Sequence, residues 1–305
     1  MKHFYMLDGR SVWWPAASRA ALRFGYHVAR VVGEEWRERE LRNAVGFVRP
    51  DAHPARLRAH QAAYHAMKDA GIRMVQDDAQ IDLYEDKRGQ TRRWGRFMPE
   101  TRVFTTMTDA VNFARECDYP IVSKADVGAS SVNVRVLRNR LEAARHVQEL
   151  FGRGVPVRHC SGGATSRQKG YALLQRFVPH EVTWRVNVIG AGRAVFRRFN
   201  YKNKPVAQTG NVAAVTAMDE TVESLLEFAD EVARAIGSRW VALDILQEGD
   251  SWRLLETSLA WPWNEKDHAG TPIFRTDFTW GSLWDCMFDQ IESGHLAASS
   301  SSTSP

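Results

Sequence analysis

The sequence WVALDIL at residues 240–246, followed by SWRLLETS at residues 251–258, governs the interpretation of the whole chain. Both stretches are runs of aliphatic, β-branched and aromatic residues, which predict two adjacent strands joined by a polar turn at residues 247–250. One acidic residue lies inside each run, Asp244 in the first and Glu256 in the second. Because a buried carboxylate is costly unless a positive charge meets it, the pair predicts a shared hard cation, with Mg²⁺ the best match. The alternative is a half-solvated hairpin whose two acids lie in water.

Length and composition exclude several classes of protein. With 305 residues the chain is long enough for two or more cooperating domains. Its three cysteines, Cys117, Cys160 and Cys286, form no C-x-x-C pair, which argues against a disulfide framework or a zinc site and favours a reducing cytoplasm. No window has the length and hydropathy of a signal peptide or a membrane span, so we expect a soluble cytoplasmic protein without a membrane partner.

The net charge of +5 is a mild basic excess, which favours anionic ligands such as nucleotides. The excess is too small to indicate nucleic-acid binding by itself. We also predict no basic helix and no aromatic RNA-binding motif, so nucleic acid is the weakest of the candidate partners.

The first part of the chain alternates strand and helix signals. Strands are predicted at residues 4–7, 27–32, 44–48 and 72–75, and helices at residues 15–24 and 54–70. Alternation of this kind is typical of a parallel sheet, so we predict a small parallel α/β domain over residues 1–84.

From residue 97 the pattern of strands and helices changes, and we divide the rest of the chain into two α+β regions at residues 85–178 and 179–296. Helices are predicted at residues 107–117, 141–151 and 220–236, and further strands at residues 119–124, 132–137, 171–177, 183–189 and 193–200. The glycine-rich segment 153–169 is predicted to be a mobile loop, and the serine-rich tail 297–305 to be disordered.

Two segments in the first α+β region have the character of a nucleotide site. Lys124 ends a predicted buried strand and precedes the small-residue loop DVGASS at residues 126–131, which offers a phosphate one fixed cation and accessible backbone amides. Downstream, the apolar strand LLQRFV at residues 173–178 breaks at Pro179 and is followed by Glu181, so backbone groups there can pair with a purine and the carboxylate can hold ribose hydroxyls. The alternatives are a lysine that leaves a strand for solvent and an ordinary strand end with an exposed acid.

Arginines are expected to face the two acids of the hairpin. In the strand TWRVNV at residues 183–188, period-two spacing places Arg185 on the face opposite Trp184, and Arg197 and Arg198 lie in the next predicted strand. A sheet face that carries arginines opposite two acids can hold a triphosphate and its metal.

The order of these segments resembles the ATP-grasp superfamily, in particular carboxylate–amine ligases similar to the ribosomal-protein glutamate ligases and the D-alanine–D-alanine ligases. The resemblance begins with EDK at residues 85–87, continues with PET at residues 99–101, and lies in the order and spacing of elements rather than in long identical strings. It implies a small amino-terminal α/β domain followed by two α+β subdomains that enclose the nucleotide.

The resemblance also implies the site residues. Its nucleotide contacts are Lys87, Lys124, Gly128, Ser130, Ser131, Gln175, Arg176, Phe177, Val178 and Glu181, its catalytic arginines are Arg185 and Arg198, and its metal ligands are Asp244, Glu256 and Ser258. The two lysines would lie over the phosphates, residues 126–131 would form a flap, and residues 175–178 would contact the adenine. The implied cofactors are ATP and Mg²⁺, with Mn²⁺ as an alternative metal.

The chain departs from the family pattern at three positions. Ser258 replaces the asparagine of the usual E-x-N motif, Trp184 replaces the acid that often precedes Arg185, and Ala125 replaces the proline that usually follows the second lysine. A serine hydroxyl is still an oxygen ligand for magnesium, so the number of metals stays open. A catalytically silent copy also stays open.

The resemblance implies an ATP- and Mg²⁺-dependent carboxylate–amine ligase that forms an amide or peptide bond through an acyl phosphate and releases ADP and phosphate. Its substrates would be a small-molecule carboxylate and an amine, amino acids or a peptide among them, and a homodimer stays open. Residues 201–204, 208–211 and 261–264 fall where the family lines its acceptor pocket. The alternatives are a kinase that phosphorylates a hydroxyl and a silent ATP-binding subunit.

Overall fold

The computed structural model describes the conformation of residues 1–7, 13–51, 53–127, 133–158, 165–200, 207–258, 272–276 and 282–296. Within these residues, every helix falls short of the length and apolar character that a membrane crossing requires.

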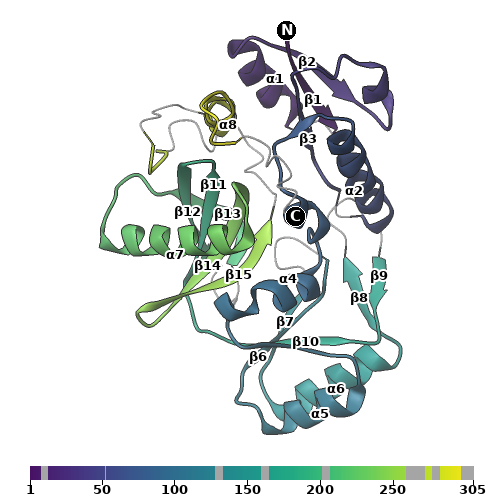
Figure 1. Ribbon diagram of the computed structural model, residues 1–305. Helices are drawn as coiled ribbons and strands as arrows, with labels where there is room; N and C mark the ends of the chain where they lie inside the picture. Colours follow the sequence, from purple (N-terminus) through teal and green to yellow (C-terminus); the bar gives the residue numbers. More distant parts are fainter. Residues whose placement is uncertain are drawn as a thin grey trace, which may run out of the picture.

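The amino-terminal region folds as the predicted parallel α/β unit (Figure 1). It contains strands β1 (Lys2–Leu7), β2 (Tyr26–Val31), β3 (Ala44–Val48) and β4 (Arg73–Met74), helices α1 (Trp14–Arg23), α2 (Pro54–Asp69) and α3 (Asp78–Asp82), and the 3₁₀ turn η1 (Glu35–Glu38). The sheet order is β2-β1-β3-β4, and all neighbouring strands are parallel. Both long helices begin with proline in the first turn, where the missing N–H has no helical partner to lose.

A second sheet forms the lower body of the molecule in Figure 1. Its elements are strands β5 (Thr101–Phe104), β6 (Ile121–Lys124), β7 (Val134–Leu137) and β10 (Ala172–Arg176), covered by helices α5 (Met107–Glu116) and α6 (Arg140–Phe151). The order is β5-β10-β6-β7 with antiparallel pairing throughout. The helices and strands bury a separate apolar core, so this unit has its own hydrophobic support.

The segment 153–169 was predicted to be a mobile loop, and this prediction is wrong for the two parts of it that form strands. Strands β8 (Val155–Arg158) and β9 (Thr165–Gln168) pair as an antiparallel ribbon. The glycine-rich composition concealed a short alternation, in which Val157 is buried while its neighbours Pro156 and Arg158 are exposed.

The largest sheet contains the predicted hairpin. Its strands are β11 (Val182–Ile189), β12 (Gly192–Asn200), β13 (Ala207–Ala214), β14 (Trp240–Glu248) and β15 (Ser251–Ser258), in the order β13-β12-β11-β14-β15, and helix α7 (Glu220–Ile236) packs on one face. The Asp219 side chain accepts a hydrogen bond from the Val222 N–H at the start of α7, and Gly237 ends the helix with φ at 75°. Alternate residues of the central strands therefore point into the α7 core, and their neighbours point to the opposite face.

The opposite face is apolar at one end and charged at the other. At the apolar end, Trp240 packs against Phe47 of β3 with ring centroids 5.7 Å apart, and helix α8 (Leu283–Glu292) closes the same core. The sequence pattern did not predict α8. Its aromatic side chains pack between this sheet and the amino-terminal unit, and the ring centroids of Phe288 and Phe4 lie 5.0 Å apart. The charged end faces helix α4 (Lys87–Trp94), which contacts β15 and β5 and lies between the two antiparallel sheets (Figure 1).

Two further elements differ from expectation. Helix α4, which continues into the 3₁₀ turn η2 (Gly95–Phe97), is a basic helix, so the prediction that the chain has none is wrong. Its sequence KRGQTRRW is too polar to show an apolar periodicity. Residues 208–211, predicted as part of an acceptor pocket, lie in strand β13, which was missed because its polar sequence lacks a β-strand signature.

Candidate functional site

Asp244 and Glu256 lie directly opposite each other in the β14–β15 hairpin. Their neighbours Leu243 and Ile245 belong to the α7 core, so the two acids project from the other face of the sheet. A β-bulge adjoins the pair, because Ile245 is aligned with Leu254 and leaves Leu255 as the extra residue. The two predicted metal ligands are therefore neighbours in space.

Asp244 is only 4% exposed and is held by one arginine from the adjacent strand β11 and one from β12, the next strand along the sheet. Arg185, its register partner on β11, donates from Nε and Nη2 to the two carboxylate oxygens over 2.7 and 2.8 Å. Arg198 on β12 donates to Oδ2 over 3.0 Å. Burial opposes ionisation of Asp244, but the two arginines outweigh it and lower the pKa of the carboxyl to about 2. Asp244 is therefore ionised, with both oxygens engaged.

Glu256 is paired with Lys87 at the start of α4. The Lys87 Nζ lies 3.3 Å from Glu256 Oε2 and donates to the Asp126 carbonyl over 3.4 Å. Burial alone would lower the pKa of Lys87, but the Glu256 carboxylate reverses that effect and the pKa is raised. The Asp86 side chain caps α4 by accepting from the Gly89 N–H over 2.9 Å, and a Cβ on Gly89 would meet Asp86 Oδ2 at 2.4 Å. Only glycine fits there without displacing the cap that positions Lys87.

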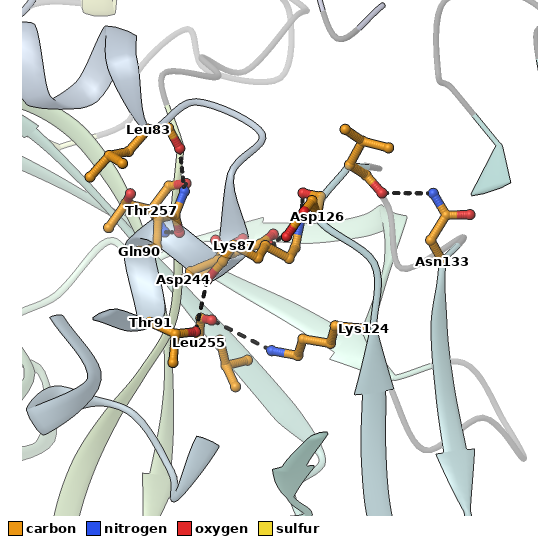
Figure 2. A network of polar contacts seen from close by, with 12 residues as sticks. Leu83, Lys87, Gln90, Thr91, Lys124, Asp126, Asn133, Asp244, Leu255 and Thr257 are labelled. Carbon is orange, nitrogen blue, oxygen red and sulfur yellow. Dashed lines mark hydrogen bonds and ion pairs between the residues drawn. The ribbon is translucent and has the colours of Figure 1, made fainter. Parts of the chain in front are cut away.

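Lys124 approaches the same point from the other sheet. It ends β6 and is 9% exposed, and its Nζ donates to the carbonyl of the bulged Leu255 over 3.5 Å (Figure 2). Burial lowers the pKa of Lys124 to about 8, although Glu256 acts in the opposite direction. This amine is therefore short of the negative charge that would satisfy it.

Together these residues form what we call the charged cluster: Lys87, Lys124, Arg185, Arg198, Asp244 and Glu256. Four cations face two carboxylates in a largely buried space, so the cluster has an excess of positive charge. A polyanion such as a triphosphate matches that excess.

Comparison with known proteins identifies the fold. No family model matches the sequence, and a search of curated proteins finds no match. Among solved structures, D-cycloserine synthetase DcsG is similar with a TM-score of 0.62 at 14% identity, covering 97% of this chain and all (100%) of that one. D-alanine–D-alanine ligase from Bacillus anthracis has a TM-score of 0.62 at 11% identity, covering 97% of each chain. A RimK-domain ATP-grasp protein from Sphaerobacter thermophilus has a TM-score of 0.59 at 17% identity, covering 84% of this chain and 91% of that one.

The chain has the ATP-grasp fold. The fold expectation is therefore confirmed, with helix and strand units of the predicted kind. The structural similarity shows the fold alone, because sequence identities of 11 to 17% are too low to carry a substrate from these proteins to this chain.

Within this ATP-grasp fold, Gln90 fastens α4 to the hairpin and was not found by sequence reasoning. Its Nε2 donates to the carbonyls of Leu83 and Thr257 over 3.0 and 3.2 Å, and its Oε1 accepts from the Thr257 N–H over 3.1 Å (Figure 2). Thr257 lies between Glu256 and Ser258, so Gln90 fixes the strand segment that carries two predicted metal ligands. A glutamine in a basic stretch gives no sequence signal for such a contact.

Asp126 anchors the start of the predicted flap. Its carboxylate accepts from the Arg88 Nε over 2.6 Å and from the Arg88 N–H over 3.2 Å, and the Arg88 guanidinium lies 4.0 Å from the ring centroid of Tyr171. The predicted flap residues Gly128, Ser130 and Ser131 lie outside the described part of the chain.

The residues predicted to contact adenine occupy the end of β10. The Gln175 side chain is buried and donates to Thr101 Oγ1 over 2.7 Å, and Arg176 forms an ion pair with Glu248. These two side chains serve contacts within the protein, while Phe177 and Val178 follow the last residue of the strand. Two backbone groups here are engaged as well, since the Arg176 N–H donates to the Glu100 carbonyl over 2.8 Å and the Val178 carbonyl lies 2.7 Å from His180 Nδ1. The adenine contact at residues 175–178 therefore stays a prediction.

The remaining predicted residues have mixed positions. Ser258 is aligned with Ala242, two residues beyond Glu256 and on the same face of the sheet. Glu181 is exposed just before β11, and in the described residues no hydrogen bond or ion pair joins it to the charged cluster. The candidate acceptor segments at 201–204 and 261–264, and the tail predicted to be disordered at 297–305, lie outside the described residues.

Asn187 is a second residue that sequence reasoning missed. It lies two residues after Arg185 on the same face, is 3% exposed, and is aligned with Ala194 and Ala242 on the neighbouring strands. In the described structure, neither polar atom of its carboxamide has a hydrogen-bond partner. Burying a carboxamide without hydrogen-bond partners costs free energy, so Asn187, next to the charged cluster, lowers the stability of the folded protein.

The cluster's ligand types fit the magnesium ion that the ATP-grasp fold implies. Magnesium binds in proteins through one or two carboxylates together with phosphate oxygens, and Asp244, Glu256 and the Ser258 hydroxyl are hard oxygen donors on one face. No group of three or more His, Cys, Asp or Glu side chains with metal-binding geometry occurs in the described residues, so the phosphates would have to complete the coordination.

Proposed function

We propose that this chain is an ATP- and Mg²⁺-dependent ligase that joins a carboxylate to an amine and releases ADP and phosphate. The observation that carries the proposal is the alignment of Asp244 with Glu256 beside Lys87, Lys124 and Arg185, with cations in excess. A nucleotide triphosphate supplies the negative charge that this arrangement lacks.

The residues of the cluster have distinct proposed roles. Lys87 on α4 and Lys124 on β6 come from separate elements and would neutralise phosphate oxygens. Arg185 is held by Asp244 through two hydrogen bonds and would fix the orientation of that carboxylate. Arg198 makes a single hydrogen bond to Asp244, so it is the arginine better able to turn towards an acyl phosphate.

The proposed reaction has two steps. A substrate carboxylate attacks the γ-phosphorus, the bond to the leaving ADP oxygen breaks, and an acyl phosphate forms. The amine nitrogen then attacks the acyl carbon, phosphate leaves, and the amine proton is lost as the amide forms. The lysines and arginines stabilise the charge that develops on the transferring phosphoryl group. A bound Mg²⁺ would add to that stabilisation.

Structural neighbours support a ligase and an ATP-dependent one. D-alanine–D-alanine ligase from Bacillus anthracis has been solved in complex with ATP and is 10% identical to this chain. The ATP-grasp ligase PsnB has been solved with a minimal precursor, Mg and ADP, and is 12% identical. We propose a peptide or amino-acid substrate for this chain on that basis.

A catalytically silent ATP-binding subunit is the second candidate, and Ser258 in place of the family's asparagine favours it. The two candidates are separated by incubating the purified protein with ATP, Mg²⁺, hydroxylamine and pools of carboxylates. A ligase releases ADP and traps an acyl hydroxamate that mass spectrometry detects, whereas ATP binding without ADP release from any pool supports the silent subunit. ADP release without hydroxamate, together with a phosphorylated hydroxyl, would identify a kinase.

The site assignment is tested with Lys124→Ala and Glu256→Gln. Each removes a charge from the cluster, and each is expected to abolish Mg²⁺-dependent ADP release while circular dichroism shows an intact fold. Lys169→Ala, which removes an exposed lysine beyond β9, is the matched control and should keep full activity. Full activity in either cluster variant contradicts the assignment.

A further inference from the structure

The outer side of α4 and η2 carries three exposed arginines that the proposed reaction does not use. Arg92 and Arg93 end α4, and Arg96 lies in η2. In the described structure, none of these guanidinium groups forms an ion pair or hydrogen bond, and Arg96 only stacks on Phe97, 4.6 Å from its ring centroid. We call these three residues the arginine cluster.

Three other arginines, in contrast, form ion pairs with carboxylates of the protein. Arg88 is paired with Asp126, Arg102 with Glu100, and Arg176 with Glu248. Cations at a helix end are favoured by the helix dipole, but Arg96 lies beyond the helix. Adjacent like charges also repel, and α4 contains no acidic residue to offset them. The arginine cluster is therefore unsatisfied by the protein itself.

The arginine cluster lies close to the charged cluster because both use α4. The inner side of the helix supplies Lys87 and Gln90 to the hairpin, while the outer side presents the arginines. At 1.5 Å per α-helical residue, Arg92 is displaced from Lys87 by about 7.5 Å along the axis, and with two further 3₁₀ steps of about 2 Å Arg96 is displaced by about 14 Å. An extended chain spans about 13 Å with four residues. A peptide docked on the outer side must also pass the width of the helix, about 10 Å, so about six to eight extended residues connect the arginines with the charged cluster.

We propose that the arginine cluster docks an acidic peptide segment of the substrate and delivers a neighbouring residue of that peptide to the charged cluster. This inference rests on the proposed ligase function. Guanidinium groups bind carboxylates through paired hydrogen bonds, which makes a row of aspartates or glutamates the best match. The adjoining aromatic residues Trp94 and Phe97 are buried and offer no stacking surface for bases, which favours a peptide over a nucleic acid.

The test uses the full chain and a fluorescein-labelled deca-glutamate peptide, with binding followed by fluorescence anisotropy at low and moderate salt. Wild-type protein should bind the peptide, and the triple variant Arg92→Gln/Arg93→Gln/Arg96→Gln should bind it about tenfold more weakly, as expected for three exposed ion pairs. Glutamine keeps the helix propensity of arginine, and thermal melting verifies the fold. The matched control is Arg138→Gln/Arg140→Gln/Arg145→Gln, which removes three exposed arginines at α6 and should leave binding unchanged.

The proposal is overturned if both triple variants bind deca-glutamate as the wild type does. It is also overturned if a labelled single-stranded DNA 20-mer binds more tightly than the peptide through the same three arginines. Nucleotide binding by the wild type is measured separately with a fluorescent ATP analogue. A wild-type protein that binds the ATP analogue but not deca-glutamate would refute only the docking surface, whereas a wild-type protein that binds no nucleotide would refute the proposed function.

Discussion

Replacing Asp244 with asparagine tests whether the buried carboxylate is the counter-charge of the two arginines. The carboxyl pKa falls from an ordinary 3.8 to about 2, and a shift of roughly two units corresponds to a stabilisation on the order of 2–3 kcal/mol. Removing one member of a buried ion pair costs about 3–5 kcal/mol because the remaining charges lose their partner. We therefore expect Asp244→Asn to lower the free energy of unfolding at pH 7 by about 3 kcal/mol.

The pH dependence gives this prediction a sign. Since the pKa of Asp244 is lower in the folded state than in the unfolded state, its stabilisation is complete above pH 3.8 and is lost as the pH falls towards 2. Urea unfolding of the wild type and of Asp244→Asn should differ by a constant amount between pH 6 and 8, and the difference should shrink below pH 4. Adding Arg198→Met to Asp244→Asn removes one of the stranded cations and should recover part of the loss. A loss below about 1 kcal/mol at pH 7 would refute the reasoning.

Three other substitutions follow from buried polar groups. Because the pKa of Lys124 is lowered from 10.5 to about 8, the unfolded state binds more protons than the folded state between pH 8 and 10.5. The free energy of unfolding of the wild type, measured by urea titration, should therefore rise with pH over this range, and Lys124→Met should lack the rise. Asn187→Leu removes an unpartnered carboxamide and should stabilise the protein by about 1–3 kcal/mol, seen as a higher Tm in calorimetry; an unchanged or lower Tm would contradict it. Gln90→Leu leaves the Thr257 N–H and carbonyl without that partner, so it should lower stability by about 1–3 kcal/mol and speed hydrogen exchange at the Thr257 amide; unchanged exchange would show that Gln90 does not hold this strand.

The elements that could be predicted from the sequence are those whose pattern is long and regular. The β14–β15 hairpin consists of two apolar runs that meet at a turn. Helix α7 has an apolar helical periodicity with clear ends at Asp219 and Gly237. Helix α4 and strand β13 lack that periodicity, because half of the residues of α4 are charged and β13 mixes small apolar residues with polar ones. Their structures depend on packing against other parts of the chain, which a local pattern does not contain.

The same distinction applies to the charged cluster. The alternation of residues 183–188 predicts that Arg185 shares a face with Asp244, because both strands belong to one sheet and period-two spacing fixes the face. A local pattern, the strand end before a small-residue loop, suggested Lys124, whereas only the resemblance suggested Lys87. Their approach to Glu256 and Leu255 depends on the placement of α4 and β6 beside the hairpin. The bulge at Leu255, which turns its carbonyl towards Lys124, has no sequence signal at all.

Both acids of the hairpin already form ion pairs within the protein, and these pairs bear on the effect of having Ser258 where the family has asparagine. Asp244 is held by two arginines and Glu256 by Lys87, so the negative charges that would meet a metal are fixed by the protein before any ligand binds. An asparagine and a serine at position 258 are both neutral oxygen donors, so the replacement leaves the charge of the cluster unchanged. Electrostatic attraction for a triphosphate therefore depends on the four cations, and the residue at 258 affects only the coordination geometry. We therefore predict that Ser258→Asn alters the Mg²⁺ concentration needed for ADP release and leaves the affinity for ATP without metal unchanged. Equilibrium binding of a fluorescent ATP analogue in the absence of Mg²⁺ measures that affinity. A changed metal-free affinity would show that the residue at position 258 contributes to the charge balance.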